Sequence, residues 1–577
     1  MVRRSTGLSG RRTNPAVVWL AAAALFAAVF VVFGEVRSFG FLDYDDGDYI
    51  LRNLHLREGS AIERLRWAFT AFHAANWHPL TWISFMVDGS LFGLDPGWYH
   101  VENLLLHGLN TVLLLGLLVR LTGSVGKSVL VATFFALHPL RVESVAWVTE
   151  RKGLLMALFT FLALHAYVIY VRRRTLGRYL AMLILVAGAL LAKPQAVSLP
   201  LLLLILDWWP LGRIGEGALP AAWAVVVREK APLFLMAGVV SVLTVAAQRQ
   251  VGAVASLEGF SVGERFACAV VAPVAYLGKT LWPARLALAY PIVSPVGWQI
   301  AGAVLVLMGI TTIAVRFRRT QPWLSAGWLG FLVLLAPVSN LFQTGGQALA
   351  DRYTYLPHLL LFTGAVWSGV WFLRNTPRIR AAAAVVILVV AVALSVAACR
   401  QTGFWRDDLT LFSHAVAVTQ GNWKMHYNLG NTFERLGREE EAEGQYRLAL
   451  AARPAYPEAL NNLGALHGRR GETGLAESLF NRAVSIQPGY GPGWFNLGFQ
   501  SEQAGDLGGA LKQYGRAAAL QPDAAEPRVR MGRIFARQGR WEEASAFCRE
   551  ALRLDPGSAG AAACLREASH LPENGAQ

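Results

Sequence analysis

The sequence NNLGALHGRRGETGLAESLFNRAVSIQP, residues 461–488, decides the fold of the C-terminal part of the chain. Its Leu463-Gly464 pair, Phe480 and Pro488 belong to a pattern that recurs every 34 residues. Small residues let two helices pack closely, an aromatic ring fills the space between them, and proline stops the second helix. A generic helical bundle does not repeat several positions at a strict step, so the sequence predicts a stacked helical repeat.

The pattern extends through four full units, and a half unit with Phe412 and Ala415 in register precedes them. The equivalent positions are Leu429-Gly430, Leu497-Gly498 and Met531-Gly532; Ala442, Ala476, Ala510 and Ala544; Tyr446 and Tyr514; Pro454, Pro522 and Pro556. The fourth unit has Cys548 where the others have an aromatic residue. The pattern resembles the tetratricopeptide repeat (TPR).

The composition of the rest of the chain indicates a membrane protein. Of 577 residues, 54% are hydrophobic and only 16% are charged, against about 25% charged in an average soluble domain. These values exclude both disorder and a single soluble domain. Residues 400–577 contain 20 basic and 20 acidic residues, so the first 399 carry the whole net charge of +15. Because this excess lies between long apolar runs, it indicates membrane topology, and we do not expect nucleic acid as a partner.

Twelve apolar segments approach the length of about 20 residues that a membrane helix needs. They lie near 15–35, 99–119, 128–148, 153–171, 178–193, 196–212, 231–247, 264–283, 297–315, 322–341, 356–373 and 380–399. No cleavage site follows the first, so it is interpreted as a retained anchor. Basic clusters predict the cytoplasmic side: Arg3, Arg4, Arg11 and Arg12; Arg120 and Lys127; Arg172–Arg174 and Arg178; Arg213, Arg228 and Lys230; Arg316, Arg318 and Arg319; Arg374, Arg378 and Arg380.

The last basic cluster predicts that the final helix begins on the cytoplasmic side and ends outside. With the N-terminus also in the cytoplasm, the number of spans must then be odd, so one of the twelve segments should not span the membrane. Segment 264–283 contains Glu264, Arg265, Lys279 and Pro273, and we expect that it does not span. The predicted fold is all-α, with a polytopic bundle of about 11 spans and an outward C-terminal solenoid. The predicted domains are 1–399, the membrane bundle; 400–422, a linker and half repeat; 423–556, four TPR repeats; and 557–577, a capping helix and tail.

The cysteines show neither CxxC pairing nor metal-ligand spacing. They are therefore interpreted as residues that lie in cores or face the membrane. They are Cys268, Cys399, Cys548 and Cys564.

The first outward loop, residues 36–98, begins with an acidic run, Asp43-Tyr44-Asp45-Asp46-Gly47-Asp48-Tyr49-Ile50. One interpretation is a solvated Asp-Gly turn. The other is functional, because clustered carboxylates raise one another's pKa and one of them can then act as a base or metal ligand. Apolar neighbours favour a turn held at the membrane surface.

Further polar residues occur near the outer ends of the predicted helices. Four of them, His100, Asn103, His107 and Asn110, share one helix face, and either a cavity or packing between helices explains them. The segments Trp77-His78-Pro79, His138-Pro139 with Glu143, Glu150-Arg151-Lys152, Lys193-Pro194 and Asp351-Arg352-Tyr353 follow. Cations at the outer interface suit a phosphate group, although Asp351 or a lipid headgroup is an alternative partner for Arg352.

The order of these motifs before a repeat tail resembles the transmembrane and tetratricopeptide-repeat-containing (TMTC) family. The resemblance rests on Asp-Asp and Tyr-Ile after the first helix, His-Pro-Leu-Thr, His-Pro with Val-Glu-Ser-Val-Ala-Trp, Lys-Pro and Arg-Tyr-Thr-Tyr-Leu-Pro. It implies a GT-C type glycosyltransferase that uses a polyprenyl-phosphate sugar, dolichyl-phosphate mannose in eukaryotic members. It also implies that Asp45 and Asp46 are catalytic and that Asp43 and Asp48 are dispensable. The Ala-, Arg- and Gly-rich composition suggests a bacterial protein. With the basic clusters on the cytoplasmic side, we expect an inner-membrane protein whose repeats are periplasmic.

The leading hypothesis is an enzyme that transfers a hexose, mannose by resemblance, to a hydroxyl of a protein or envelope acceptor. Asp45 is the expected base, and Asp46 either orients it or binds a divalent metal; no other cofactor is predicted. The donor phosphate is assigned to Arg352, Lys193 and His138. The rest of the pocket is assigned to Glu143, His78, His100 and Asn103, and the acceptor groove to Asn428, Asn431, Asn461, Asn462 and Asn496.

Two other functions compete with this hypothesis. A non-catalytic, membrane-anchored TPR scaffold for envelope assembly would need no pocket around Asp45. A transporter ranks last, because the acidic residues lie at the outer ends of the helices and not at the membrane midplane. The sequence contains no Gly-rich phosphate loop, which favours a lipid-linked donor over a nucleotide.

Overall fold

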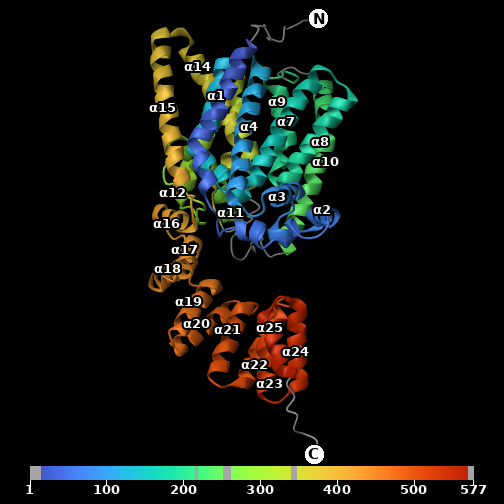
Figure 1. The fold of residues 1–577 in the computed structure, drawn as a ribbon. Helices are drawn as coiled ribbons and strands as arrows, with labels where there is room; N and C mark the ends of the chain where they lie inside the picture. Colours follow the sequence, from blue (N-terminus) through green and yellow to red (C-terminus); the bar gives the residue numbers. More distant parts are fainter. Residues whose placement is uncertain (1–13, 215–218, 251–260, 340–346, 570–577) are drawn as a thin grey trace, which may run out of the picture. The chain divides into compact units, whose positions relative to one another are not determined.

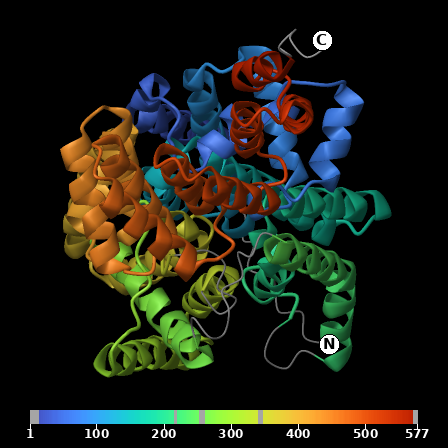
Figure 2. The ribbon, with the colours of Figure 1, turned by 90° about the horizontal axis from the view of Figure 1, so that it is seen from below.

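The protein is helical, as predicted (Figure 1, Figure 2). The computed structural model describes residues 14–214, 219–250, 261–339 and 347–569, and these residues include no strand beyond an isolated bridge between Tyr290 and Leu349. The chain divides into two compact units, residues 1–419 and 420–577. The half repeat therefore belongs to the first unit.

The first unit contains sixteen α-helices among its described residues. They are α1 (Pro15–Phe33), α2 (Ala61–Thr70), α3 (Pro79–Phe92), α4 (Pro96–Thr122), α5 (Val125–Leu137), α6 (Val142–Ala146), α7 (Arg151–Arg172), α8 (Leu176–Ala192), α9 (Leu199–Trp208), α10 (Pro220–Gln250), α11 (Val262–Leu281), α12 (Gly297–Arg316), α13 (Pro322–Leu335), α14 (Pro357–Phe372), α15 (Pro377–Gly403) and α16 (Asp408–Val418).

Six stretches of the described chain are long and apolar enough to cross a membrane. They are Pro15–Ser38, Pro96–Thr122, Val148–Arg172, Pro220–Arg249, Gly297–Arg316 and Pro377–Gly403. A seventh forms if α5 and Pro139–Ala146, which bend by 60° at their break, count as one span. Helix α11 is not among them, but neither are α8, α9, α13 and α14, which were predicted to span, so the expectation for segment 264–283 stays a prediction. The total of 11 spans stays a prediction. Arg3, Arg4, Arg11 and Arg12 lie outside the described residues.

Helix α4 is the central element of the bundle, where it packs against α1, α5 and α7. Asp95 caps its first turn by accepting a hydrogen bond from the Gly97 N–H (2.9 Å), and Gly123, with φ of +67°, ends it. The main core lies on the inner side of α4 with α7, α8, α9 and α14. By contrast, α12 and α15 bury few side chains and leave long apolar faces exposed, as helices next to lipid do.

The C-terminal end of α15 and the end of α1 lie at the same end of the bundle. Arg406, just after α15, forms an ion pair with Glu35 at 2.6 Å. The Asp43 N–H donates a hydrogen bond to the Asp408 carboxylate at 2.8 Å. The first loop and the start of the half repeat are therefore on one side of the bundle.

The second unit consists of four helix pairs and a final helix. They are α17 (Trp423–Arg435), α18 (Glu439–Ala452), α19 (Pro457–Arg469), α20 (Thr473–Ile486), α21 (Gly491–Gln503), α22 (Leu507–Leu520), α23 (Glu526–Arg537), α24 (Trp541–Leu554) and α25 (Ala559–Ser569).

The repeated glycines explain how each pair packs. A Cβ atom added to Gly430 would lie 2.6 Å from the Tyr446 ring. The same addition at Gly464 would lie 2.7 Å from Phe480, and at Gly498 it would lie 2.7 Å from Tyr514. Only glycine leaves room for these rings, as the sequence pattern predicted.

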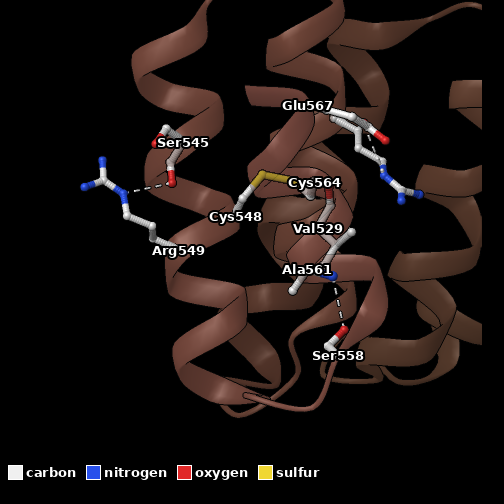
Figure 3. The surroundings of a disulfide bond; sticks show 9 residues. Val529, Ser545, Cys548, Arg549, Ser558, Ala561, Cys564 and Glu567 are labelled. Atoms are coloured by element: carbon white, nitrogen blue, oxygen red, sulfur yellow. Dashed lines mark hydrogen bonds and ion pairs between the residues drawn. A yellow bond between two sulfur atoms is a disulfide. The ribbon is translucent and has the colours of Figure 1, made fainter. Parts of the chain in front are cut away.

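Sequence analysis placed the cysteines in cores or facing the membrane but did not predict that two of them pair. Cys548 of α24 and Cys564 of α25 form a disulfide (Figure 3). Cys268 and Cys399 are free. A Cβ atom at Gly532 would lie 2.7 Å from the Cys548 sulfur and 2.8 Å from the Cys564 sulfur. The disulfide thus occupies the place of the aromatic ring in the earlier repeats.

Candidate active site

The acidic loop after α1 is fixed by buried apolar side chains. Leu42, Tyr49 and Ile50 are 1%, 2% and 0% exposed. Tyr49 and Ile50 pack with residues of α3 and α4 in a separate small core. Residues Gly47–Leu51 form a π-helical turn, a rare geometry that is frequent at functional sites. The loop is therefore part of the folded bundle and not a solvated Asp-Gly turn.

Asp46 is the anchor of this loop. Its carboxylate is fully buried and accepts hydrogen bonds from the Leu42 N–H (3.0 Å) and the Thr149 N–H (3.1 Å). The Thr149 hydroxyl also donates to it. Burial raises the pKa of Asp46 from 3.8 to about 6, while the donors from Leu42 and Thr149 oppose that shift. Since its oxygens are occupied by these donors, Asp46 holds the loop against the segment before α7.

Asp45 differs from the other three carboxylates of the run. It is half-buried, and its carboxylate has no hydrogen bond or ion pair with any described residue. Asp48 is exposed and pairs with Arg52 at 2.8 Å, and Asp43 lies 4.0 Å from the same guanidinium. Among the four carboxylates, Asp45 alone is thus half-buried while its carboxylate oxygens form no hydrogen bond or ion pair with the described residues.

Two of the predicted phosphate ligands, Lys193 and Arg352, meet at a shared carboxylate. Glu150 is buried in a 3-10 turn, Val148–Glu150, and accepts two hydrogen bonds of 2.9 Å from the Lys193 ammonium. The Arg352 Nε lies 3.5 Å from the same carboxylate. Glu143 accepts from the Arg352 backbone N–H at 2.7 Å and pairs with its guanidinium. The ends of α8, α6 and the turn Asp351–Thr354 converge here.

Aromatic rings flank this charged group. The Trp147 ring lies 5.5 Å from Tyr44 and 5.2 Å from the Arg352 guanidinium. The Lys152 ammonium lies 5.4 Å from Trp147 and 4.6 Å from Tyr49, between the two rings. Tyr44 and Tyr49 flank Asp45 in the chain, so the rings connect the acidic loop to the cations.

His138, the third predicted phosphate ligand, lies in another cluster. Its ring contacts the Thr280 carbonyl oxygen at 3.0 Å and accepts from the Leu140 N–H at 3.2 Å. Its ring packs beside His358. Within the described chain it contacts neither Lys193 nor Arg352. The structure does not bring the three together, because the break between α5 and α6 directs His138 toward α11 and α14.

The other predicted pocket residues support the walls of the site. Asn103 donates to the Trp147 carbonyl at 3.0 Å, and His100 contacts the Gly40 carbonyl at 3.3 Å. His78 packs beside the Tyr49 and Trp82 rings, and its ring nitrogens have no hydrogen-bond partner among the described residues. All three are buried.

Farther along the same face of α4, His107 and Asn110 both contact the Tyr355 hydroxyl, at 2.7 and 3.3 Å. Packing between helices therefore accounts for this face better than a cavity does.

The predicted acceptor asparagines form a ladder along the first helices of successive repeats. Asn462 donates to Asn431 at 2.9 Å, Asn461 donates to Asn462 at 3.3 Å, and Asn496 donates to Asn461 at 2.8 Å. The Asn428 side chain lies outside this ladder and makes no hydrogen bond with the described residues.

Sequence reasoning noted Glu150 and Lys152 only as part of a charged segment whose cations suit a phosphate, and it did not single out Thr149. The charges of Glu150 and Lys152 were visible in the turn before α7, but nothing local predicts which partners they meet. Nothing in the sequence around Thr149 indicated a role in the site, because its contact with Asp46 joins residues 103 positions apart. The described residues contain no group of three or more metal-ligating side chains.

Comparison with known proteins supports the relationship inferred from the motifs. The TPR_16 tetratricopeptide-repeat family matches residues 401–457, 427–491 and 502–559. The chain is 24% identical to the protein O-mannosyl-transferase TMTC1 of Homo sapiens over 77% of this chain and 56% of that protein. It is 27% identical to the protein O-mannosyl-transferase TMTC4 of Mus musculus over 70% of this chain and 63% of that protein. The chain is therefore a homologue of these TMTC proteins and carries TPR repeats.

The chain spans 54% to 63% of the length of the first three curated relatives that it matches. Among solved structures, the crystal structure of MamA is similar at 18% identity and a TM-score of 0.24, over 26% of this chain and 86% of MamA.

The first prediction concerns the titration of Asp46. Because burial raises its pKa to about 6, the proton that Asp46 binds stabilises the fold at acid pH, and this contribution is lost as the pH rises through about 6. In infrared titrations of the protein in lipid, one component of the protonated-carboxyl band should disappear near that pH, and this component should be missing from Asp46→Asn. Thr149→Val removes a donor to the ionised form and should move the midpoint to higher pH.

Asp43→Asn is the matched control. Because Asp43 is exposed, this substitution should leave the band unchanged. An unaltered midpoint in Thr149→Val would contradict the assignment of the hydroxyl contact.

Proposed function

We propose that this protein is a membrane glycosyltransferase that moves a sugar, mannose by analogy with the names of its relatives, from a polyprenyl-phosphate donor to a hydroxyl of a protein acceptor. The observation that carries the proposal is the uncommitted carboxylate of Asp45. It is fixed beside the buried Asp46, on a loop whose aromatic residues contact the cations of the site.

The chemistry is a single displacement at the anomeric carbon. Asp45 takes the proton of the acceptor hydroxyl, and the acceptor oxygen forms a bond to that carbon as the bond to the phosphate oxygen breaks. The electron pair of the broken bond stays on the polyprenyl phosphate. Asp46 acts as the positioning residue, because its hydrogen bonds fix the loop that carries the base.

The donor is expected to be a lipid because the site lies where the bundle meets its outer loops. The site combines the Asp45 carboxylate with Lys193 and Arg352, whose positive charges are suited to binding a phosphate. These two cations are already paired with Glu150 and Glu143, so they fix the surroundings of the phosphate. The absence of a Gly-rich nucleotide loop from the sequence also favours a lipid-linked donor.

The repeat unit is proposed to bind the protein acceptor. Asn side chains on successive first helices can bond the backbone of an extended peptide with little demand on its sequence. The side chains of Asn431, Asn461 and Asn462 form hydrogen bonds with one another. The groups left for a peptide are therefore the side chain of Asn428 and the side-chain amide oxygen of Asn496.

The repeats and the acidic loop are proposed to lie on the outer, periplasmic side of a bacterial inner membrane. The ion pair of Arg406 with Glu35 supports this, since it joins the exit of α15 to the end of α1. The disulfide between Cys548 and Cys564 also supports it, because disulfides persist mainly in oxidising compartments.

The catalytic prediction is that Asp45→Asn lowers sugar transfer by about a hundred- to ten-thousand-fold, as loss of a general base typically does. The amide is nearly isosteric, so the thermal unfolding temperature should stay unchanged. Transfer of radiolabelled mannose from polyprenyl-phosphate mannose to an extract of envelope proteins measures the effect. Asp48→Asn is the matched control and should be mild, since Asp48 is exposed beside Arg52. Full turnover in Asp45→Asn would refute the assignment of Asp45 as the base, whereas absence of transfer by the wild type would favour the scaffold function.

The acceptor prediction uses Asn428→Ala combined with Asn496→Ala. Transfer to protein should fall several-fold, while the slow hydrolysis of the lipid-linked sugar continues, because the membrane unit is unaltered. Asn481→Ala, on the exposed face of the second-helix element α20, is the control. Unchanged transfer to protein in the double variant would exclude these asparagines from acceptor binding.

The localisation prediction uses Gln487→Cys, at an exposed position after α20, in a chain whose free Cys268 and Cys399 are replaced by serine. A membrane-impermeant maleimide should label residue 487 in intact spheroplasts. Protection of that cysteine until the membrane is permeabilised would place the repeats in the cytoplasm and overturn the topology.

A further inference from the structure

Three cations lie in the candidate active site, and they differ in their partners. Arg352 is bound by Glu143 through both its backbone N–H and its guanidinium. Lys193 donates to both oxygens of Glu150 at 2.9 Å. Lys152 has no carboxylate within ion-pair distance among the described residues; its ammonium donates only to the Tyr49 hydroxyl, at 3.4 Å. Lys152 is thus the cation whose charge no carboxylate compensates at short range.

The surroundings of Lys152 make this lack of a partner costly. The residue is only 9% exposed, and its ammonium lies over the rings of Tyr49 and Trp147, at 4.6 and 5.4 Å. Cation–π contacts offset part of the loss of hydration. A buried ammonium nevertheless needs an anion or several hydrogen-bond acceptors. The site is therefore suited to an anionic ligand at Lys152.

The negative charge of Asp45 is the complement of Lys152. Asp45 and Lys152 interact electrostatically, but they form no ion pair at contact distance. Asp45 has no partner of its own among the described residues, so the site contains one uncommitted carboxylate and one uncommitted ammonium. Oppositely charged groups that are held apart can act on two different atoms of a substrate placed between them.

We propose that Lys152 binds the phosphate of the lipid-linked donor and stabilises it as the leaving group, an inference that rests on the function proposed above. The donor phosphate diester carries one negative charge. When the bond from the anomeric carbon to oxygen breaks, the electron pair goes to the phosphate, which then carries two negative charges, while the acceptor proton goes to Asp45.

A cation without a carboxylate partner stabilises this added charge more than a paired cation does, because Glu150 and Glu143 already neutralise Lys193 and Arg352. Lys152 therefore contacts the reacting group, whereas Lys193 and Arg352 position it. Lysine suits this role as a compact point charge with three donors.

The test compares the binding of undecaprenyl phosphate and undecaprenol to the full-length protein in lipid nanodiscs. The wild type should prefer the phosphate. Lys152→Met should weaken phosphate binding on the order of ten- to a hundredfold, as expected for the loss of a charge-assisted hydrogen bond. Its affinity for the uncharged alcohol should not change, and Lys152→Arg should restore most of the preference. Lys127→Met, which removes a lysine beside Trp367 in another part of the bundle, should match the wild type.

The comparison of the two lipids separates phosphate recognition from a structural role, because a misfolded variant would lose affinity for both lipids. If Lys152→Met misfolds, Lys152→Arg still reports whether a positive charge at this position supports phosphate binding. Retention of the phosphate preference in Lys152→Met would overturn the assignment of Lys152 and leave the proposed function intact. A wild type with no preference for the phosphate would overturn both.

Discussion

The buried carboxylate of Asp46 is the contact on which the geometry of the site depends. It satisfies the backbone N–H groups of Leu42 and Thr149 at once, at 3.0 and 3.1 Å, and so fastens the loop after α1 to the turn before α7. Asp45 precedes one end of this contact, and Glu150 follows the other. The distance between the uncommitted carboxylate and the cations is therefore set by a few hydrogen bonds. These bonds are strong because the group is shielded from water.

The second constraint is electrostatic. Glu150, Arg151 and Lys152 are consecutive, yet each contacts a different partner: Glu150 binds Lys193, Arg151 binds Asp88 at 2.9 Å, and Lys152 contacts Tyr49. A turn that enters a helix directs adjacent side chains to different sides, which allows three charges to be separated within one helical turn. Buried ion pairs add little net stability, but they fix which groups meet. Here they determine which ammonium stays available.

The fold of the repeat unit could be predicted closely, because the 34-residue step encodes local helix pairs and the glycine–aromatic contact between them. The membrane bundle could be predicted as a set of apolar helices, but not its breaks: the bend at His138-Pro139 moved His138 away from Lys193 and Arg352. In the candidate site, the acidic loop and two cations were visible as residue types near the ends of helices. The contact of Asp46 with Thr149 and the shared Glu150 were not visible, because they join segments whose approach depends on packing of the whole bundle. Likewise, no cysteine spacing predicted that α25 would bring Cys564 against Cys548.

The disulfide follows from the same packing rule as the aromatic rings. In the first three repeats, the next helix pair covers the apolar surface, whereas a single helix covers that of the fourth repeat as a cap. Helix α25 supplies that cap, with Ala561 and Cys564 buried against Val529 and Cys548. Cysteine is smaller than tyrosine, so Cys548 alone would leave space beside Gly532; the second sulfur, from Cys564, fills it. One covalent bond thus replaces the volume of the missing ring and joins the cap to the repeat, which explains why the aromatic pattern stops at this position.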